Sequence, residues 1–112
     1  MACGSRLFRA LPKSGESSVI GHQLLRSATS VGANYRAVCR ARSTAEFVAK
    51  LGVVIEEADE SLYWLELLEA AEIVPAPRLA PLHEECNELT AIFVSARETA
   101  RRIQKSKVKS QK

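Results

Sequence analysis

The residues best suited to chemistry in this sequence are two histidines and three cysteines. His83 and Cys86 lie three residues apart, which would place two zinc ligands on one face of a helix. A zinc site needs further ligands, and the chain holds no second pair with a matching spacing. Cys86 also belongs to a regular apolar stripe, which favours a small buried side chain. We therefore expect neither a metal site nor a cofactor.

Catalytic patterns of other kinds are equally hard to find. Carboxylate-bridged di-metal bundles place a glutamate three residues before a histidine, and neither histidine has one there. The acidic run at residues 56–60 lacks the glycine turn of a calcium-binding loop. No phosphate-binding loop, dinucleotide fingerprint or nucleophile elbow occurs. The sequence thus predicts a protein that is not an enzyme and has no small-molecule substrate.

Helical spacing dominates the rest of the chain. Apolar residues three and four apart run from Ile20 to Val38, which predicts a helix that begins after Ser14. The sequence Ser43–Thr44–Ala45–Glu46 is a capping box that predicts the start of the next helix. Three prolines between residues 75 and 81 separate this helix from a last one, whose stripe ends at Ile103.

The expected fold is all-α, with a bundle over residues 1–103. A short segment at about residues 5–11 would be its first helix, much shorter than the three others. Residues 104–112 have no apolar periodicity and are expected to form a basic, disordered tail.

The helix expected after Ser43 is apolar on two sides. Its core stripe runs from Phe47 to Leu65, and a second apolar set lies on roughly the opposite side, with Glu57 at its border. In a chain of 112 residues, the second side is more easily covered by a partner than by the chain itself. We therefore predict a homo-oligomer. Its interface would contain Val53, Glu57, Trp64, Leu67 and Leu68.

Charge is strongly segregated along the chain. Residues 1–42 carry +6, residues 43–100 carry −9 and residues 101–112 carry +6, which gives the net charge of +3. Basic clusters of this kind can neutralise phosphates with little base specificity. The alternative is that they solubilise the protein or pair with its acidic middle, and both interpretations stay open. The candidate nucleic-acid-binding residues are Arg26, Arg36, Arg40, Arg42, Arg101, Arg102 and Lys105.

Composition indicates a cytoplasmic protein of one domain. Hydrophobic residues make up 46% of the chain and charged residues 26%, as in ordinary folded proteins. An odd number of widely spaced cysteines and the lack of a signal sequence favour a reducing compartment. No apolar run approaches the roughly 20 residues needed to span a bilayer. We expect no membrane partner.

Five phrases of the sequence resemble a known family. The chain looks like the bacterial four-helix-bundle proteins of 23S rRNA intervening sequences, also called S23 ribosomal proteins, over about residues 7–102. The phrases are Leu11–Ser14, Gln23–Tyr35, Glu46–Leu51, Glu57–Leu65 and Asn87–Phe93.

The resemblance implies an up-and-down antiparallel four-helix bundle that assembles into rings, typically pentamers. A related bundle, the accessory protein of diversity-generating retroelements, binds nucleic acid and a reverse transcriptase. Lys50 lies in one of the matching phrases and joins the predicted nucleic-acid-binding set. The expected function is a non-enzymatic oligomer that binds nucleic acid. The alternative is a structural or protein-interaction module.

The chain departs from the family at its start. The family's first helix is long, whereas about ten residues precede Pro12 here. Either the start was assigned too far downstream, or a shortened helix leaves a groove that neighbouring subunits must cover.

Overall fold

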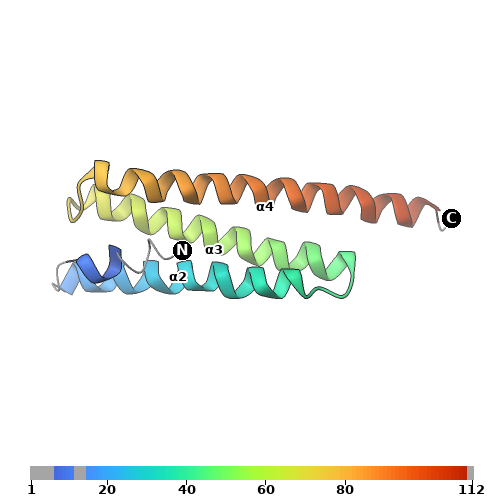
Figure 1. The fold of residues 1–112 in the computed structure, drawn as a ribbon, viewed down its shortest axis with the longest axis horizontal. Coiled ribbons are helices and arrows are strands. Elements are labelled where there is room, and N and C mark those ends of the chain that lie inside the picture. The colour runs from blue at the N-terminus through green and yellow to red at the C-terminus, as the bar shows by residue number, and fades with distance from the viewer. Residues whose placement is uncertain (1–6, 12–14, 111–112) are drawn as a thin grey trace.

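A computed structural model describes residues 7–11 and 15–110 of the chain, and its helices form a rod of 60 × 21 × 19 Å. Residues 7–10 form a short first helix, followed by α2 (Gly15–Cys39), α3 (Thr44–Ala70) and α4 (Ala76–Ser110). The three long helices run antiparallel to their neighbours in the chain (Figure 1). The predicted all-α class with a shortened first helix is confirmed. Among the described residues, no helix combines the length and apolarity needed to cross a bilayer.

The start of α3 follows the predicted capping motif. Ser43 is extended, and its hydroxyl oxygen accepts a hydrogen bond from the backbone N–H of Glu46 at 3.1 Å. The Glu46 carboxylate accepts from the N–H of Arg42 at 3.4 Å, one residue earlier than a reciprocal capping box requires. Ser14, the cap predicted for α2, lies outside the described residues.

The turn between α3 and α4 closes with a Schellman motif. Glu72 adopts a left-handed conformation with φ 57°, and its N–H bonds the carbonyl of Glu69 at 3.0 Å. The N–H of Ile73 bonds the carbonyl of Leu68, also at 3.0 Å. Pro77 then lies in the first turn of α4, where its missing N–H costs no helical hydrogen bond.

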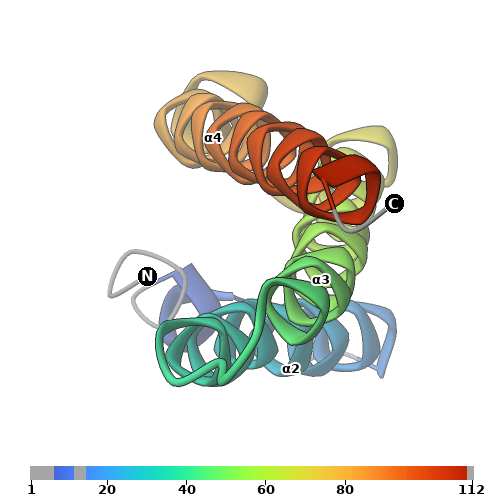
Figure 2. The same ribbon diagram turned by 90° about the vertical axis from the view of Figure 1, so that its right-hand side faces the viewer.

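α3 is the centre of the molecule. It packs against both α2 and α4, whereas α2 and α4 stand apart on its two sides (Figure 2). The rings of Tyr35 on α2 and Phe93 on α4 do meet, with centroids 5.6 Å apart. The side of the rod that faces the viewer in Figure 1 therefore lacks a fourth long helix.

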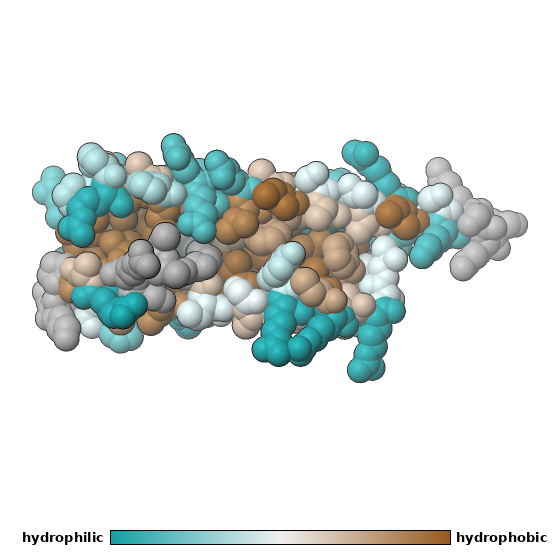
Figure 3. All heavy atoms as spheres, viewed as in Figure 1, coloured by the Kyte–Doolittle hydropathy of each residue, from teal (hydrophilic) through white to brown (hydrophobic). Residues whose placement is uncertain are grey.

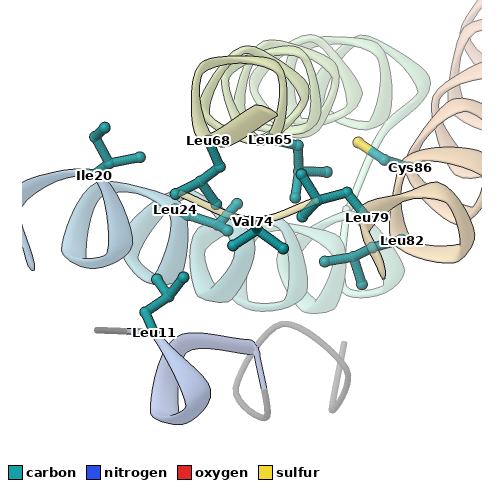
Figure 4. Packing of buried hydrophobic residues seen from close by; sticks show 9 residues of the cluster. All are labelled: Leu11, Ile20, Leu24, Leu65, Leu68, Val74, Leu79, Leu82 and Cys86. Atoms are coloured by element: carbon teal, nitrogen blue, oxygen red, sulfur yellow. The ribbon is translucent and has the colours of Figure 1, made fainter. Parts of the chain in front are cut away.

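The short first helix fills one end of this open side. Leu11 is buried, and a close-up of the core shows it reaching toward α2, α3 and α4 (Figure 4). Gly21 makes room for it, because a Cβ at that position would lie 2.8 Å from Leu11 and 3.3 Å from Phe8. The core at this end consists of Leu11, Ile20, Leu24, Leu65, Leu68, Val74, Leu79, Leu82 and Cys86.

A second core cluster lies toward the turn between α2 and α3. Its buried members are Val31, Val38, Leu51, Val54, Ala58 and Phe93. Between the two clusters, the buried hydroxyls of Ser27 and Ser61 are hydrogen-bonded at 3.0 Å and tie α2 to α3.

The end of α4 differs from the prediction. The sequence predicts that the helix stops near Ile103, but α4 continues to Ser110. Residues 104–110 contain no glycine or proline, and lysines are favourable near a helix C-terminus. Residues 104–110 therefore have no apolar side that could pack, but they can still be helical.

The left-handed Glu72 generates a stability prediction. Such a conformation costs a side-chain-bearing residue about 1–2 kcal/mol and costs glycine almost nothing. We expect Glu72→Gly to raise the free energy of unfolding by about 1 kcal/mol, measured by urea denaturation. The matched control Glu69→Gly, inside α3, should lower it by about the same amount. A destabilised Glu72→Gly variant would contradict this description of the turn.

Candidate nucleic-acid interface

The turn between α2 and α3 gathers basic side chains around a surface hollow of about 500 Å³. Arg36 lies in the last turn of α2, and Arg40 and Arg42 lie in the connection that follows its end at Cys39. Lys50 lies in the second turn of α3. Ala33 and Ala37 also line the hollow, and their small side chains leave it open beside the arginines. Glu46 is its one acidic lining residue.

The hollow carries an excess of positive charge, with four cationic side chains and one carboxylate. Glu46 is engaged at the start of α3 by the N–H of Arg42. None of the ion pairs in the described part of the chain involves Arg36, Arg40, Arg42 or Lys50. The three arginines are exposed and Lys50 is half-buried. Four cations free to meet an anion are typical of a site that binds phosphates.

Arg26, another predicted member, lies elsewhere. Its guanidinium donates to the carboxylate of Glu60 on α3 and to the side chain of Gln23. Glu60 also accepts from the indole N–H of Trp64 at 3.2 Å. Arg26 precedes Arg36 by nearly three turns, about 15 Å along α2, so it is not part of the hollow.

The remaining predicted cations lie at the same end of the rod, on another element. α4 runs antiparallel to α3 and extends past the α2–α3 turn (Figure 1). Arg101 pairs with Glu98 at 3.3 Å, and Arg102 and Lys105 are exposed. The structure thus brings these three to the basic end without placing them in the hollow.

The residues predicted to form the oligomer interface on α3 differ in burial, and some lie in the core whereas others lie at the surface. Leu68 is completely buried within the subunit, so it is a core residue and cannot contact a neighbour. Trp64 and Leu67 are half-buried and pack against the same core cluster. The first helix and the α3–α4 turn cover these apolar residues of α3, which the sequence pattern did not predict.

Val53 remains exposed, at 38%, and the exposed apolar surface of α3 also includes a residue that was not predicted. Tyr63 is 55% exposed, and its ring meets the edge of Trp64 with centroids 4.9 Å apart. One buried carboxylate oxygen of Glu57, Oε2, has no hydrogen-bond partner among the described residues. The helical spacing that selected Val53 and Leu67 also places Tyr63 on this side, so the pattern contained its signal.

The histidine and cysteine side chains do not converge on a reactive site. The Cys86 thiol donates to the carbonyl of Ala58 at 3.2 Å, and burial raises its pKa. His83 instead lies 3.8 Å from the Glu66 carboxylate and 3.1 Å from Asn87. Within residues 7–11 and 15–110, no three His, Cys, Asp or Glu side chains form a group that could hold a metal ion.

The fold and its basic end define a small helical-bundle protein with a surface suited to polyanions. Residues 4–95 match the model of the family described as 23S rRNA-intervening sequence protein. The chain belongs to this family.

A solved structure supports the same assignment. The protein comes from Bacteroides thetaiotaomicron and is described as a protein with unknown function from the S23 ribosomal protein family. It is 33% identical and superposes with a TM-score of 0.79, covering 85% of this chain and 88% of that one. No curated protein matches the chain.

The two described cysteines should differ sharply in reactivity. Cys39 is exposed, whereas the raised pKa of Cys86 leaves less thiolate, the reactive form, at a given pH. We expect iodoacetamide at pH 8 to alkylate Cys39 much faster than Cys86 in the folded protein, and unfolding to remove the difference. Peptide mass spectrometry gives both rates. Equal rates in the folded state would contradict the burial of Cys86.

Proposed function

We propose that this protein is a non-enzymatic helical-bundle protein that binds the phosphate backbone of nucleic acid at its basic end. The observation that carries the proposal is the hollow at the α2–α3 turn, where four cations surround one engaged carboxylate. Backbone phosphates are the anions that such a cluster of arginines and lysine suits best.

The extension of α4 enlarges this surface. Arg101, Arg102 and Lys105 belong to the last turns of α4, and the end of α4 extends past the α2–α3 turn at the same end of the rod (Figure 1). A nucleic-acid strand spans several phosphates, so it can contact both groups of cations where a small anion would contact one. We infer sequence-tolerant binding, because no aromatic side chain lines the hollow for base stacking.

A second candidate function is assembly with other protein chains. Val53 and Tyr63 are exposed on α3, the ring of Tyr63 meets half-buried Trp64, and one buried carboxylate oxygen of Glu57 has no hydrogen-bond partner among the described residues. Aromatic anchors of this kind are enriched at protein interfaces. We propose that this side of α3 joins subunits of a homo-oligomer, for which the family resemblance implies a pentamer.

Binding of a labelled single-stranded RNA, followed by fluorescence anisotropy, tests the main proposal. Four phosphate contacts in the hollow predict that the logarithm of the binding constant falls with the logarithm of salt concentration with a slope of about −3, and contacts with the end of α4 steepen it further. The double variant R36A/R40A should lower the affinity and reduce the size of the slope by about 1.5, because two phosphate contacts are lost. A duplex DNA of equal length shows whether the site prefers one form of nucleic acid.

The control is Arg78→Ala, which removes an exposed cation near the start of α4, at the opposite end of the rod. It should leave both the affinity and the slope nearly unchanged. An affinity that does not depend on salt concentration would refute a phosphate-backbone site at the α2–α3 turn. So would an equal loss of affinity in Arg78→Ala and R36A/R40A. Purified protein free of bound nucleic acid and inert toward both probes would favour the protein-interaction role.

Light scattering tests assembly through α3. We expect Val53→Lys to reduce the mass of the oligomer, because it places a charge in the proposed contact. Val19→Lys is the matched control, since Val19 is an exposed valine on α2. A monomeric wild-type protein, or equal masses for the two variants, would contradict assembly through this side of α3.

A further inference from the structure

The end of α4 reaches beyond the body of the bundle. The Cys86 thiol donates to the carbonyl of Ala58, and this contact sets the register of the antiparallel pair α3 and α4. Ala58 lies 14 residues after Thr44, the first residue of α3, and Ala100 lies 14 residues after Cys86, so Ala100 comes level with the start of α3. Residues 101–110 continue from there as about 15 Å of helix past the α2–α3 turn (Figure 1).

This segment of α4 makes no contribution to the core. Ala100 is buried, whereas all residues from 101 to 107 except the half-buried Gln104 are exposed. Figure 3 shows hydrophilic side chains projecting from this end of the rod and apolar surface nearer its middle. The segment is therefore suited to a charged partner and not to an apolar one.

Positive charge surrounds this helical segment. Residues 101–110 contain five arginines and lysines and no acidic residue. At about 100° per residue, Arg102 and Lys105 lie about 60° apart on one flank of the helix, and Lys107 lies about 140–160° away from both. The cations thus occupy two opposite flanks and do not form a single stripe.

Cations on two flanks suit a polyanion that has two backbones. A single strand offers phosphates to one flank of a helix, whereas a groove has a phosphate backbone on each side. The major groove of B-form DNA is about 12 Å wide and accepts an α-helix, whose diameter with side chains is about 10–12 Å. The major groove of A-form RNA is too deep and narrow for this.

We propose that residues 101–110 of α4 lie in the major groove of B-form duplex DNA, which makes this duplex the preferred ligand of the basic end. Arg102 and Lys105 then contact one phosphate backbone, and Lys107 contacts the other. About 15 Å of helix spans about four base pairs at 3.4 Å each. Phosphate contacts carry no base sequence, so the preference is for the form of the duplex.

This inference rests on the proposed function, because the hollow at the α2–α3 turn supplies further phosphate contacts at the same end of the rod. What it adds is a role for the helical shape of the α4 end, beyond its charge. A flexible tail with the same lysines and arginines would neutralise DNA and RNA duplexes alike.

Fluorescence anisotropy of the full chain with three probes of equal length tests the preference for duplex DNA. The probes are duplex DNA, duplex RNA of the same sequence, and one strand of that RNA. We expect duplex DNA to bind at least about fivefold more tightly than duplex RNA at the same salt concentration. Methyl green, a ligand of the major groove, should compete with the protein, and netropsin, a ligand of the minor groove, should not.

Ser106→Pro tests the helical shape at constant charge. Ser106 is exposed beyond the bundle, and proline there removes a helical hydrogen bond and clashes with the carbonyl of Arg102. We expect it to weaken duplex DNA binding at least about fivefold and to change single-stranded RNA binding less than about twofold. Ser106→Ala is the matched control, because alanine keeps the helix, and it should change neither affinity.

The outcomes separate this inference from the proposed function. Equal affinity for the two duplexes overturns groove docking, and so do duplex DNA binding that is the same in Ser106→Pro and Ser106→Ala and competition by netropsin alone. In each of these cases, salt-dependent binding of the single-stranded RNA leaves the phosphate site at the α2–α3 turn standing. A protein that binds none of the three probes overturns both.

Discussion

Burial of α3 on two sides is the constraint on which the structure depends. Its core stripe, with Leu51, Val54, Ala58 and Leu65, is almost completely covered because α2 and α4 each pack against it. The outer helices have no comparable contact with each other, so each keeps a side that the subunit cannot cover. The short first helix closes one end of that open side and leaves the other bare. Surface available to partners follows directly from this arrangement.

The antiparallel order of the helices also arranges charge along the rod. The α2–α3 turn and the end of α4 meet at one end, where the arginines and lysines of segments far apart in the sequence come together. The α3–α4 turn lies at the opposite end, near Glu66, Glu69 and Glu72. A rod that is basic at one end attracts a polyanion to that end and repels it from the other. The proposed binding of a polyanion and its orientation on the rod therefore have the same electrostatic origin.

The sequence predicted the local features well, because they depend on residues three or four apart. The Ser43 cap, the three long helices and the pair Arg36 and Arg40 all follow from such spacing. The sequence alone could not show which apolar residues of one segment are covered by another segment. Leu68 was predicted to lie at an interface, but Leu11, far away in the sequence, and Val74, in the following turn, pack in the same cluster and cover it. Arg26 looked like a free cation, and its partner Glu60 lies 34 residues away. The predicted end of the last helix was wrong for a different reason, because residues 104–110 stay helical although they have no apolar side to pack against the core.

The most direct test of the whole account is an amide NMR map of the folded chain titrated with a short RNA. A basic end built by the α2–α3 turn predicts that chemical shifts change at residues 33–50 and in the last turns of α4. It also predicts that residues 66–76, around the α3–α4 turn, stay unchanged. Shifts centred on that acidic turn would contradict the account, and so would shifts spread evenly along α2.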